Sequence, residues 1–441
     1  MVQKIALFPE ASFGAALNCV GIAQALRARG AQPVFICHSG FSGVFADYGF
    51  AEYHLPPADR SGGAGQEEDY WQAFLGRHLP HFSLSPADQI QTYVAPTWDA
   101  IVDSVVAAER PLRQLLAKLQ PDAIVLDNVA MFPAVATAGC PWIRMISCAE
   151  TELGDPQVPP YLSGLAADDQ AGAEAFRKRY VTATKPAHLR MTALREASGL
   201  PPLAAGEFLD PSPYLNLLLT PDILKRDRAN PLDPALYCYL PCCVRLEPAY
   251  TVPGFPGASG PLVYVSFGSL GALDIALIKR VLQVLARLPA RFLVNVGGYR
   301  DAYEAVPDNV HLAAWFPQPS VLEQADLFIH HGGNNSLCEA LLFGVPSLIL
   351  PYCWDGHDNA RRAVEAGVGL SIARTGWSEA MLEQAIRSLL ADSAMRARLR
   401  ANAAQMGRTT GPEIASDRIL AVAASAQDKS NHAGPAPSVC G

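Results

Sequence analysis

The chain has 441 residues, of which 50% are hydrophobic and 17% are charged, and its formal net charge is −8. This length and apolar content exclude a largely disordered protein and favour two folded domains. The acidic balance argues against nucleic acid as the main partner, because surfaces that bind phosphate backbones are usually basic.

Short apolar runs alternate with helix-like segments in the first part of the chain. We predict strands at KIALF, QPVFIC, DAIVLD and WIRMIS. Between the first two strands, GAALNCVGIAQALRARG has helical spacing and ends at Gly30, a favourable helix stop. The alternation is typical of βαβ units and predicts a parallel sheet. The first apolar run is too short for a secretory signal, so we interpret it as a strand.

The alternation stops between about Thr151 and Pro248 and starts again at LVYVSFGSLG. We therefore predict two doubly wound α/β domains joined by a segment rich in proline and glycine. The predicted parts are an N-terminal domain (1–240), a linker (241–260), a C-terminal domain (261–405), a helix packing back toward the N-terminal domain (406–424) and a flexible tail (425–441).

The apolar runs and the cysteines indicate the cellular compartment of the protein and whether a metal site is expected. No run is long enough to span a bilayer. The cysteines are scattered through apolar segments, which suits a reducing cytoplasm. The CYLPCC cluster matches no standard zinc spacing, so we predict no metal site.

A small polar loop, HGGNNS, lies between the predicted strand ADLFIH and the predicted helix SLCEALLFG. Its glycine pair allows close approach of the backbone to a bulky group. Ser336 is a favourable N-cap, and the free N–H groups and dipole of a helix N-terminus attract anions. With donors from His331 and Asn335, the loop suits a diphosphate. Glu339, one turn further on, could accept hydrogen bonds from a ribose diol.

The segment from Trp315 to about Gly369 resembles the donor-binding signature of the GT-B glycosyltransferases, in the family of the UDP-glycosyltransferases. The resembling run is WFPQPSVLEQADLFIHHGGNNSLCEALLFGVPSLILPYCWDGHDNARRAVEAGVG. Looser matches lie at AQALRARG, PDAIVLDN and VYVSFGSLG. The overall pattern is similar to bacterial natural-product enzymes such as macrolide or polyene glycosyltransferases. The resemblance implies the GT-B fold, two Rossmann-like doubly wound domains facing across a cleft.

The resemblance also implies roles for the residues of this signature. Trp315 would flank the nucleobase, Gln318 would hold the base or the ribose, and Glu339 would hold the ribose. The diphosphate would lie between the HGGNNS loop and Ser269, and Asp355 would contact sugar hydroxyls. The expected donor-binding residues are Ser269, Trp315, Gln318, His331, Gly333, Asn335, Ser336, Glu339, Asp355, His357 and Asp358.

The implied reaction is transfer of a sugar from a UDP, TDP or GDP sugar to a hydroxyl, with inversion. Retaining GT-B enzymes commonly have two glutamates eight positions apart on this helix, whereas here Ser347 follows Glu339 at that spacing. Donors at a helix N-terminus can stabilise the leaving diphosphate, so we expect no metal ion and no other cofactor.

Two positions depart from the family pattern. Ala15 stands where the family has its histidine base. The candidate bases are then Asp127 first, which ends the strand DAIVLD, and Glu10 second, at the end of the first strand. Gly356 stands where the family has a sugar-binding glutamine, so either His357 or Asp358 substitutes or the sugar is different, such as a deoxy or amino sugar.

The acceptor is expected in the N-terminal half, where aromatic residues favour a lipophilic molecule such as a macrolide. Two other functions stay open: a donor-binding helper subunit without catalysis, and a nucleotide-sugar epimerase. A homodimer also stays open. The aromatic residues are Tyr70, Trp71, Phe74, Phe82, Tyr93, Trp98, Tyr161, Phe208 and Tyr214.

Overall fold

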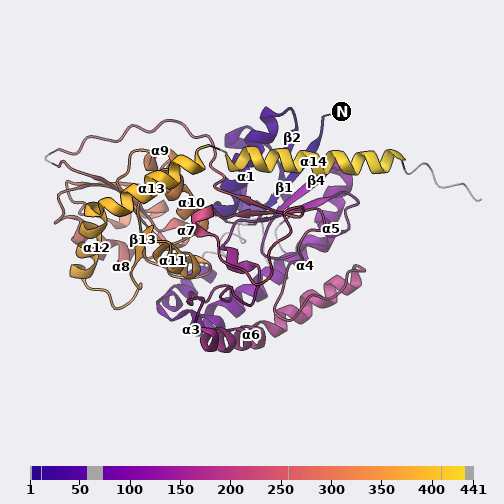
Figure 1. The fold of residues 1–441 in the computed structure, drawn as a ribbon, viewed down its shortest axis with the longest axis horizontal. Helices are drawn as coiled ribbons and strands as arrows, with labels where there is room; N and C mark the ends of the chain where they lie inside the picture. Colours follow the sequence, from indigo (N-terminus) through magenta and orange to yellow (C-terminus); the bar gives the residue numbers. More distant parts are fainter. Residues whose placement is uncertain (1, 11, 57–72, 257, 409, 433–441) are drawn as a thin grey trace, which may run out of the picture.

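The computed structural model describes residues 2–10, 12–56, 73–256, 258–408 and 410–432. Two α/β domains lie side by side, and the last helix runs back across the first domain (Figure 1). Each domain is built on one parallel sheet, which confirms the predicted fold class.

The N-terminal domain contains a seven-stranded parallel sheet of order β3-β2-β1-β4-β5-β6-β7. The order reverses between β1 and β4, and ligands of open α/β sheets bind at such a switch point, beyond the carboxyl ends of the strands. All four strands predicted for this domain are present. The strands are β1 (Lys4–Pro9), β2 (Gln32–His38), β3 (Ala51–Leu55), β4 (Ala123–Asp127), β5 (Trp142–Ile146), β6 (Leu215–Leu219) and β7 (Tyr237–Leu240).

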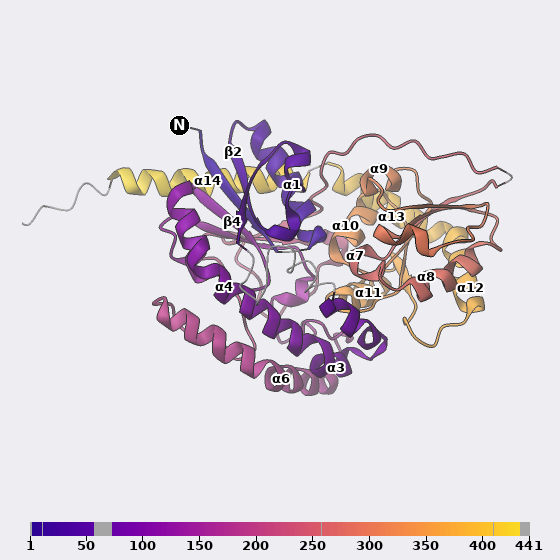
Figure 2. The same cartoon turned by 180° about the vertical axis from the view of Figure 1, so that it is seen from behind.

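Helices cover both faces of this sheet. One face packs on α1, and the other on α4, with α6 packed outside α4 (Figure 2). The two apolar faces follow from the alternation of side chains along the strands, since Ile5 and Leu7 enter one core and Ala6 and Phe8 the other. The α-helices are α1 (Phe13–Ala28), α3 (Pro86–Gln89), α4 (Ala95–Leu119), α5 (Pro133–Ala136) and α6 (Gln170–Ala197). The short 3₁₀ helices are η1 (Ser39–Phe41), η2 (Ala46–Tyr48), η3 (Leu79–Ser83), η5 (Glu150–Glu152) and η6 (Asp222–Leu224), and η4 (Ile90–Val94) is a short π-helix.

The C-terminal domain repeats this plan with a six-stranded parallel sheet of order β10-β9-β8-β11-β12-β13. Its switch point lies between β8 and β11. The strands are β8 (Leu262–Ser266), β9 (Arg291–Asn295), β10 (Val310–Ala313), β11 (Leu327–His330), β12 (Ser347–Ile349) and β13 (Gly369–Ser371). The helices are α7 (Gly268–Gly271), α8 (Ile275–Leu285), α9 (Gln318–Leu322), α10 (Asn334–Leu342), α11 (Gly356–Glu365), α12 (Glu379–Ala391) and α13 (Ser393–Met406), with the turn η7 (Gly297–Ala302).

The last helix, α14 (Gly411–His432), packs on α1 and on strands of the N-terminal sheet (Figure 1). Ala415, Ile419 and Ala423 on this helix are fully buried. The helix continues past residue 424, so the segment 425–432 of the predicted tail is helical. Residues 433–441 lie outside the described part of the chain.

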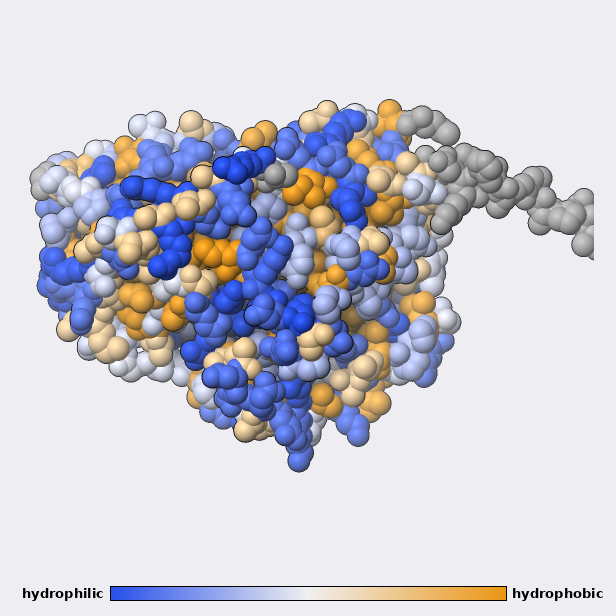
Figure 3. Space-filling view, in the orientation of Figure 1, coloured by the Kyte–Doolittle hydropathy of each residue, from blue (hydrophilic) through white to orange (hydrophobic). Residues whose placement is uncertain are grey.

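The surface gives no indication of a membrane span. In the part of the chain that the structure describes, no helix combines the length and the apolar character needed to cross a bilayer. The face drawn in Figure 3 is mostly hydrophilic, with small separated apolar patches.

Candidate functional site

The HGGNNS loop connects the carboxyl end of β11 to α10. Gly333 is the N-cap and the helix begins at Asn334, so the prediction that Ser336 caps the helix is wrong. A glycine N-cap supplies no side-chain oxygen, so no N-cap side chain bonds the N–H groups of the first turn, although the Asn334 N–H bonds to the neighbouring Asp355 carboxylate. Gly332 has φ 91°, and a Cβ there would lie 2.7 Å from the Gly356 oxygen. The tight loop therefore needs this glycine.

His331 folds back over the loop it belongs to. Its ring stacks on Tyr352 with centroids 5.2 Å apart, and a Cβ on Gly333 would lie 2.6 Å from its Nε2. Gly268, in the SFGS turn after β8, is packed on the other side of the ring. Burial lowers the pKa of His331 to about 4, so the ring is neutral near pH 7. Its Nδ1 has no hydrogen-bond partner among the described residues.

Behind the loop, four predicted donor residues converge. Gln318 Nε2 donates to Glu339 Oε2 at 2.7 Å and to Ser336 Oγ at 3.3 Å. Asn335 Nδ2 donates to Glu339 Oε1 at 3.3 Å. Glu339 is 0% exposed, and its Oε1 also accepts from Arg245 Nη1 at 3.1 Å. Arg245 comes from the interdomain linker and was not predicted.

Two further predicted donor residues lie at the surface. Trp315 is 55% exposed, between β10 and α9, which leaves its ring open to a stacking partner. Ser269 is exposed in α7, in the turn that packs on His331.

Asp355 lies at the N-cap of α11, next to the loop. Its Oδ2 accepts from Asn359 Nδ2 at 2.9 Å, and burial raises its pKa to about 7, with a further contribution from Asp358. A Cβ on Gly356 would already lie 2.7 Å from the His331 oxygen. The backbone of α11 therefore packs directly on the loop, and no glutamine side chain fits at position 356.

Asp358 faces the other domain. Its Oδ2 accepts from Thr151 Oγ1 at 2.6 Å and from Leu162 N at 2.7 Å, and its Oδ1 accepts from Gly164 N at 2.7 Å. Both carboxylate oxygens are thus occupied by the N-terminal domain. In this arrangement Asp358 joins the domains and does not point a free oxygen at a sugar.

His357 also contacts the N-terminal domain. Its Nε2 lies 3.5 Å from Nε2 of Gln89, which donates to the Tyr352 oxygen at 2.8 Å. Burial lowers the pKa of His357 to about 4, so this imidazole is neutral near pH 7.

The two candidate bases lie at the carboxyl ends of adjacent strands, β1 and β4. Asp127 is 2% exposed, and it accepts from Ser147 Oγ at 2.6 Å and from Cys19 Sγ at 3.8 Å. Burial raises its pKa well above the usual range. Glu10 is only half-buried and accepts from Ser12 Oγ at 2.7 Å, and burial raises its pKa to about 7.

Ala15 lies in the first turn of α1, where Ser12 is the N-cap, and it is buried. Its methyl group can neither accept nor donate a proton. Of the two carboxylates, Glu10 is more accessible than Asp127, which the sequence ranked first.

Known proteins resemble the chain in sequence and in fold. Residues 279–421 match the family model described as Erythromycin biosynthesis protein CIII-like, C-terminal domain. Oleandomycin glycosyltransferase of Streptomyces antibioticus is 27% identical over 230 residues, 52% of this chain and 53% of that protein. Demethyllactenocin mycarosyltransferase of Streptomyces fradiae is 28% identical over 166 residues, 37% of this chain and 36% of that protein. The chain thus spans about half the length, or less, of these two curated relatives.

Solved structures resemble the chain over nearly its whole length. The glycosyltransferase of kitacinnamycin has a TM-score of 0.70 at 21% identity and covers 96% of this chain and 99% of its own. The chain has the GT-B fold. Glycosyltransferase VinC in complex with dTDP has a TM-score of 0.67 at 17% identity, over 96% of this chain and 100% of its own. In sequence and in fold, the chain is similar to bacterial natural-product glycosyltransferases.

In this GT-B chain, Asn334 is a site residue that sequence reasoning missed. Its Nδ2 donates to the backbone oxygens of Leu219 at 2.7 Å, Ser147 at 3.0 Å and Cys148 at 3.1 Å. These acceptors follow or end β5 and β6, so the first residue of α10 is anchored to the carboxyl edge of the other sheet. The asparagine pair in HGGNNS was the available signal, but only its second member was assigned a role.

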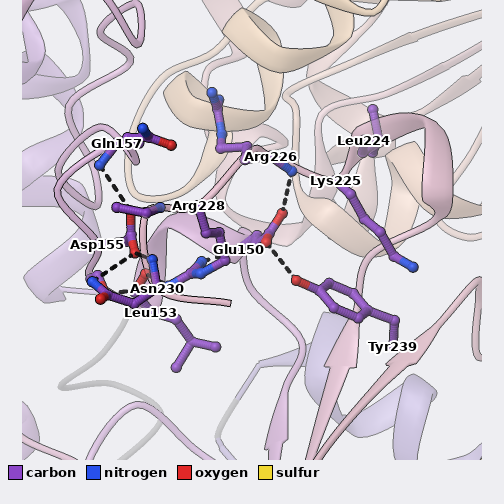
Figure 4. A network of polar contacts seen from close by, with 12 residues as sticks. Glu150, Leu153, Asp155, Gln157, Leu224, Lys225, Arg226, Arg228, Asn230 and Tyr239 are labelled. Carbon is purple, nitrogen blue, oxygen red and sulfur yellow. Dashed lines mark hydrogen bonds and ion pairs between the residues drawn. The ribbon is translucent and has the colours of Figure 1, made fainter. Parts of the chain in front are cut away.

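A second set of contacts holds α11 against the loop after β6. Arg362 Nε donates to the Leu224 oxygen at 2.8 Å. Behind this loop, Glu150 accepts from Arg226 N at 3.0 Å and from Tyr239 Oη at 2.8 Å (Figure 4). These contacts bring the two carboxyl edges of the GT-B fold together.

Most of the aromatics predicted to line an acceptor pocket are core residues. Trp98 and Phe208 stack with centroids 3.9 Å apart, and Phe82 meets Tyr93 edge-on at 5.1 Å. Tyr161 is half-buried and Tyr214 is exposed. Tyr70 and Trp71 lie outside the described residues. The buried residues of this set are Phe74, Phe82, Tyr93, Trp98 and Phe208.

Cys37, Glu52 and His54, on β2 and β3, form a group with atoms within 4.8 Å of one another that could hold a metal. Glu52 already accepts from the backbone N–H groups of Gly43, Phe45 and Ala46 at 2.7–2.9 Å, and lies 3.0 Å from His54 Nε2. Its carboxylate therefore fixes the turn before η2, which accounts for its position without a metal.

Proposed function

We propose that the chain is an inverting, metal-independent glycosyltransferase of the cytoplasm, which moves a sugar from a nucleoside diphosphate to a hydroxyl of a lipophilic natural product such as a macrolide. The observation that carries this proposal is the N-terminus of α10, which has no side-chain cap, packs against His331 at Gly333 and carries Ser336 within 3.3 Å of Gln318. Such a site attracts a diphosphate and stabilises it as it leaves.

The first donor to test is a TDP sugar, because two structural neighbours are described in complex with dTDP and thymidine diphosphate. A deoxy or amino sugar fits the packing at Gly356, where the backbone excludes the side chain that would bind additional hydroxyls. The lipophilic acceptor is supported by the names of the curated relatives, an oleandomycin glycosyltransferase and a demethyllactenocin mycarosyltransferase.

Glu10 is the proposed base. The acceptor hydroxyl gives its proton to the Glu10 carboxylate while its oxygen forms a bond to the anomeric carbon. The bond from that carbon to the diphosphate breaks, and the nucleoside diphosphate leaves with the electron pair. Attack opposite the leaving group inverts the anomeric centre. Asp127 lies beside Glu10 and is proposed to hold Glu10 in position. Glu10, Asp127 and Ser147 together are called the acid cluster.

The test combines binding and turnover. Titration calorimetry with TDP, UDP and GDP is expected to show binding of at least one of them without added metal, and to be unchanged by EDTA. Incubation of the matching sugar nucleotide with a panel of macrolide aglycones is expected to release nucleotide and to give an inverted glycoside by NMR. Absence of any nucleotide binding would refute the proposal.

One observation favours a second function. Because Ala15 lacks a titratable group, the chain could bind a donor without using it, as a helper subunit. Tight nucleotide binding with no product from any acceptor would identify the chain as that helper, and it would remove Glu10 from the base role.

A further inference from the structure

Arg245 is a buried cation in the linker between the domains. Its side chain is 2% exposed. Nη1 donates to Glu339 Oε1 at 3.1 Å, and Nε donates to Glu247 Oε1 and to Tyr48 Oη at 3.3 Å. A buried arginine with this many partners links groups that would otherwise be left uncompensated.

The partners of Arg245 come from three parts of the chain. Tyr48 ends η2 in the N-terminal domain, and its hydroxyl donates to Glu247 Oε1 at 2.9 Å. Glu247 belongs to the linker, as Arg245 does, and Glu339 belongs to α10 in the donor site. The N-terminal domain, the linker and the donor helix thus meet at one guanidinium.

Glu339 in turn determines how Gln318 is oriented. A carboxylate can only accept hydrogen bonds, so the amide nitrogen of Gln318 must face Glu339 Oε2, 2.7 Å away. The amide oxygen of Gln318 then faces away from the carboxylate, and no donor from the described part of the chain bonds it. If Glu339 were neutral, the amide could turn round and present its nitrogen instead.

We propose that Arg245 is a positioning residue for the donor: it holds Glu339 as a hydrogen-bond acceptor and so fixes Gln318 with its amide oxygen toward the nucleoside. This inference rests on the proposed function, because it concerns the same donor site. Arg245 does not touch the nucleotide. It determines which hydrogen-bonding group the donor meets.

Arg245→Met tests the proposal, since methionine keeps an apolar stem and loses the cation. We expect the KM for the sugar nucleotide to rise about tenfold, the size expected when one well-oriented hydrogen bond to the donor is lost. The kcat and the acceptor KM should change less than about threefold. Arg245→Lys should recover part of the donor affinity, because one ammonium cannot reproduce the geometry of a guanidinium.

A double-mutant cycle with Glu339→Gln separates positioning from general destabilisation. In the E339Q background position 339 no longer needs a cation, and R245M leaves the Glu247 carboxylate unpaired in both backgrounds. If the effect on the donor acts through Glu339, R245M should then weaken nucleotide binding by less than about threefold. Tyr48→Phe leaves the Arg245–Glu339 contact in place and serves as the control, with an expected change in nucleotide Kd of less than about twofold.

Three outcomes would overturn the inference: equal losses from R245M in both backgrounds, an unchanged donor KM in R245M, or a loss confined to kcat. If R245M does not fold, judged by circular dichroism, the same cycle is run with Arg245→Gln, which also removes the cation, and judged by the same criteria. Failure of the wild-type chain to bind any nucleoside diphosphate would instead refute the proposed function.

Discussion

The donor side and the acceptor side of the molecule differ in how their residues are distributed along the chain. On the donor side, the residues from Trp315 to Asp358 come from one continuous segment of the C-terminal domain. On the acceptor side, Glu10, Asp127 and Ser147 come from three strand ends far apart in sequence. Most of the proposed donor site is therefore a local structure, to which Ser269 and Arg245 are added from other parts of the chain. The acid cluster exists only through the parallel pairing of the N-terminal sheet.

The donor side and the acceptor side also differ in where they depart from the family pattern. The HGGNNS loop keeps the polar residues that the resemblance implies, but the donor side has Gly356 where a glutamine is expected, and the acceptor side has Ala15 where a base is expected. A local loop can keep its function as long as its own sequence is kept. The acid cluster can lose one group and retain another nearby group that is able to act as a base.

The largest expected effect comes from removing the proposed base. Glu10→Gln should lower kcat by about 10²–10⁴-fold with little change in nucleotide Kd, because a general base acts only in the chemical step. Initial rates and calorimetry measure the two quantities. Glu174→Gln, at an exposed position on α6, is the matched control. If Asp127→Asn abolishes turnover and E10Q does not, Asp127 is the base, as the sequence ranked it.

Substitutions in the donor loop are expected to weaken nucleotide binding, whereas Glu10→Gln is expected to lower kcat. His331→Ala and Ser336→Ala should each weaken nucleotide binding by about 10- to 100-fold, since each removes a hydrogen bond to a charged group. Calorimetry with the preferred nucleoside diphosphate measures the change. Ser388→Ala on the exposed face of α12 should leave binding unchanged. Unchanged affinity in both loop variants would remove the diphosphate from this loop.

The dependence of the reaction rate on pH should show the ionisation of Glu10 in the acid cluster. Burial raises the pKa of Glu10 to about 7, and a base acts when it is deprotonated. The rate should therefore fall about tenfold per pH unit below that pKa and level off above it. Initial rates between pH 5 and pH 9, at saturating donor, measure the profile. The same slope in E10Q would show that another group is titrating.

The contacts between the domains should affect stability more moderately. Asp358→Asn loses part of the acceptor capacity that binds Thr151, Leu162 and Gly164. We expect the free energy of unfolding to fall by about 1–3 kcal/mol in urea titrations. Asp308→Asn, at an exposed position, is the control. An unchanged stability with a raised donor KM would instead place Asp358 at the sugar.

The smallest effect is expected at the surface contact of α14. Arg29 Nε lies 2.5 Å from Asp417 Oδ1, and the Asp417 side chain is 65% exposed. Exposed ion pairs are worth at most about 1 kcal/mol, so Arg29→Ala should change the unfolding midpoint only slightly. A loss much larger than this would mean that the ion pair, and not the buried Ala415 and Ile419, holds the helix.

Much of the fold was predictable because its signals are local. The strands were visible as short apolar runs between helical segments, and the two-domain plan followed from the break in that pattern. The start of α10 was misplaced because Ser336 is a good capping residue, while the actual cap, Gly333, offers only a backbone conformation. The extent of α14 was underestimated because its last turns are polar.

The sequence by itself determined the loop between β11 and α10, since its glycines, its polar residues and the following helix lie in one segment; its role as an anion site stays a prediction. Only the tertiary structure decided what the neighbouring side chains do. Thr151 and Asp358 are 207 positions apart and share a hydrogen bond, and Arg245 meets Glu339 across 94 positions. The packing of the two sheets edge to edge determines which of these side chains meet. Burial at that junction shifts their pKa values, and their hydrogen bonds fix where they point.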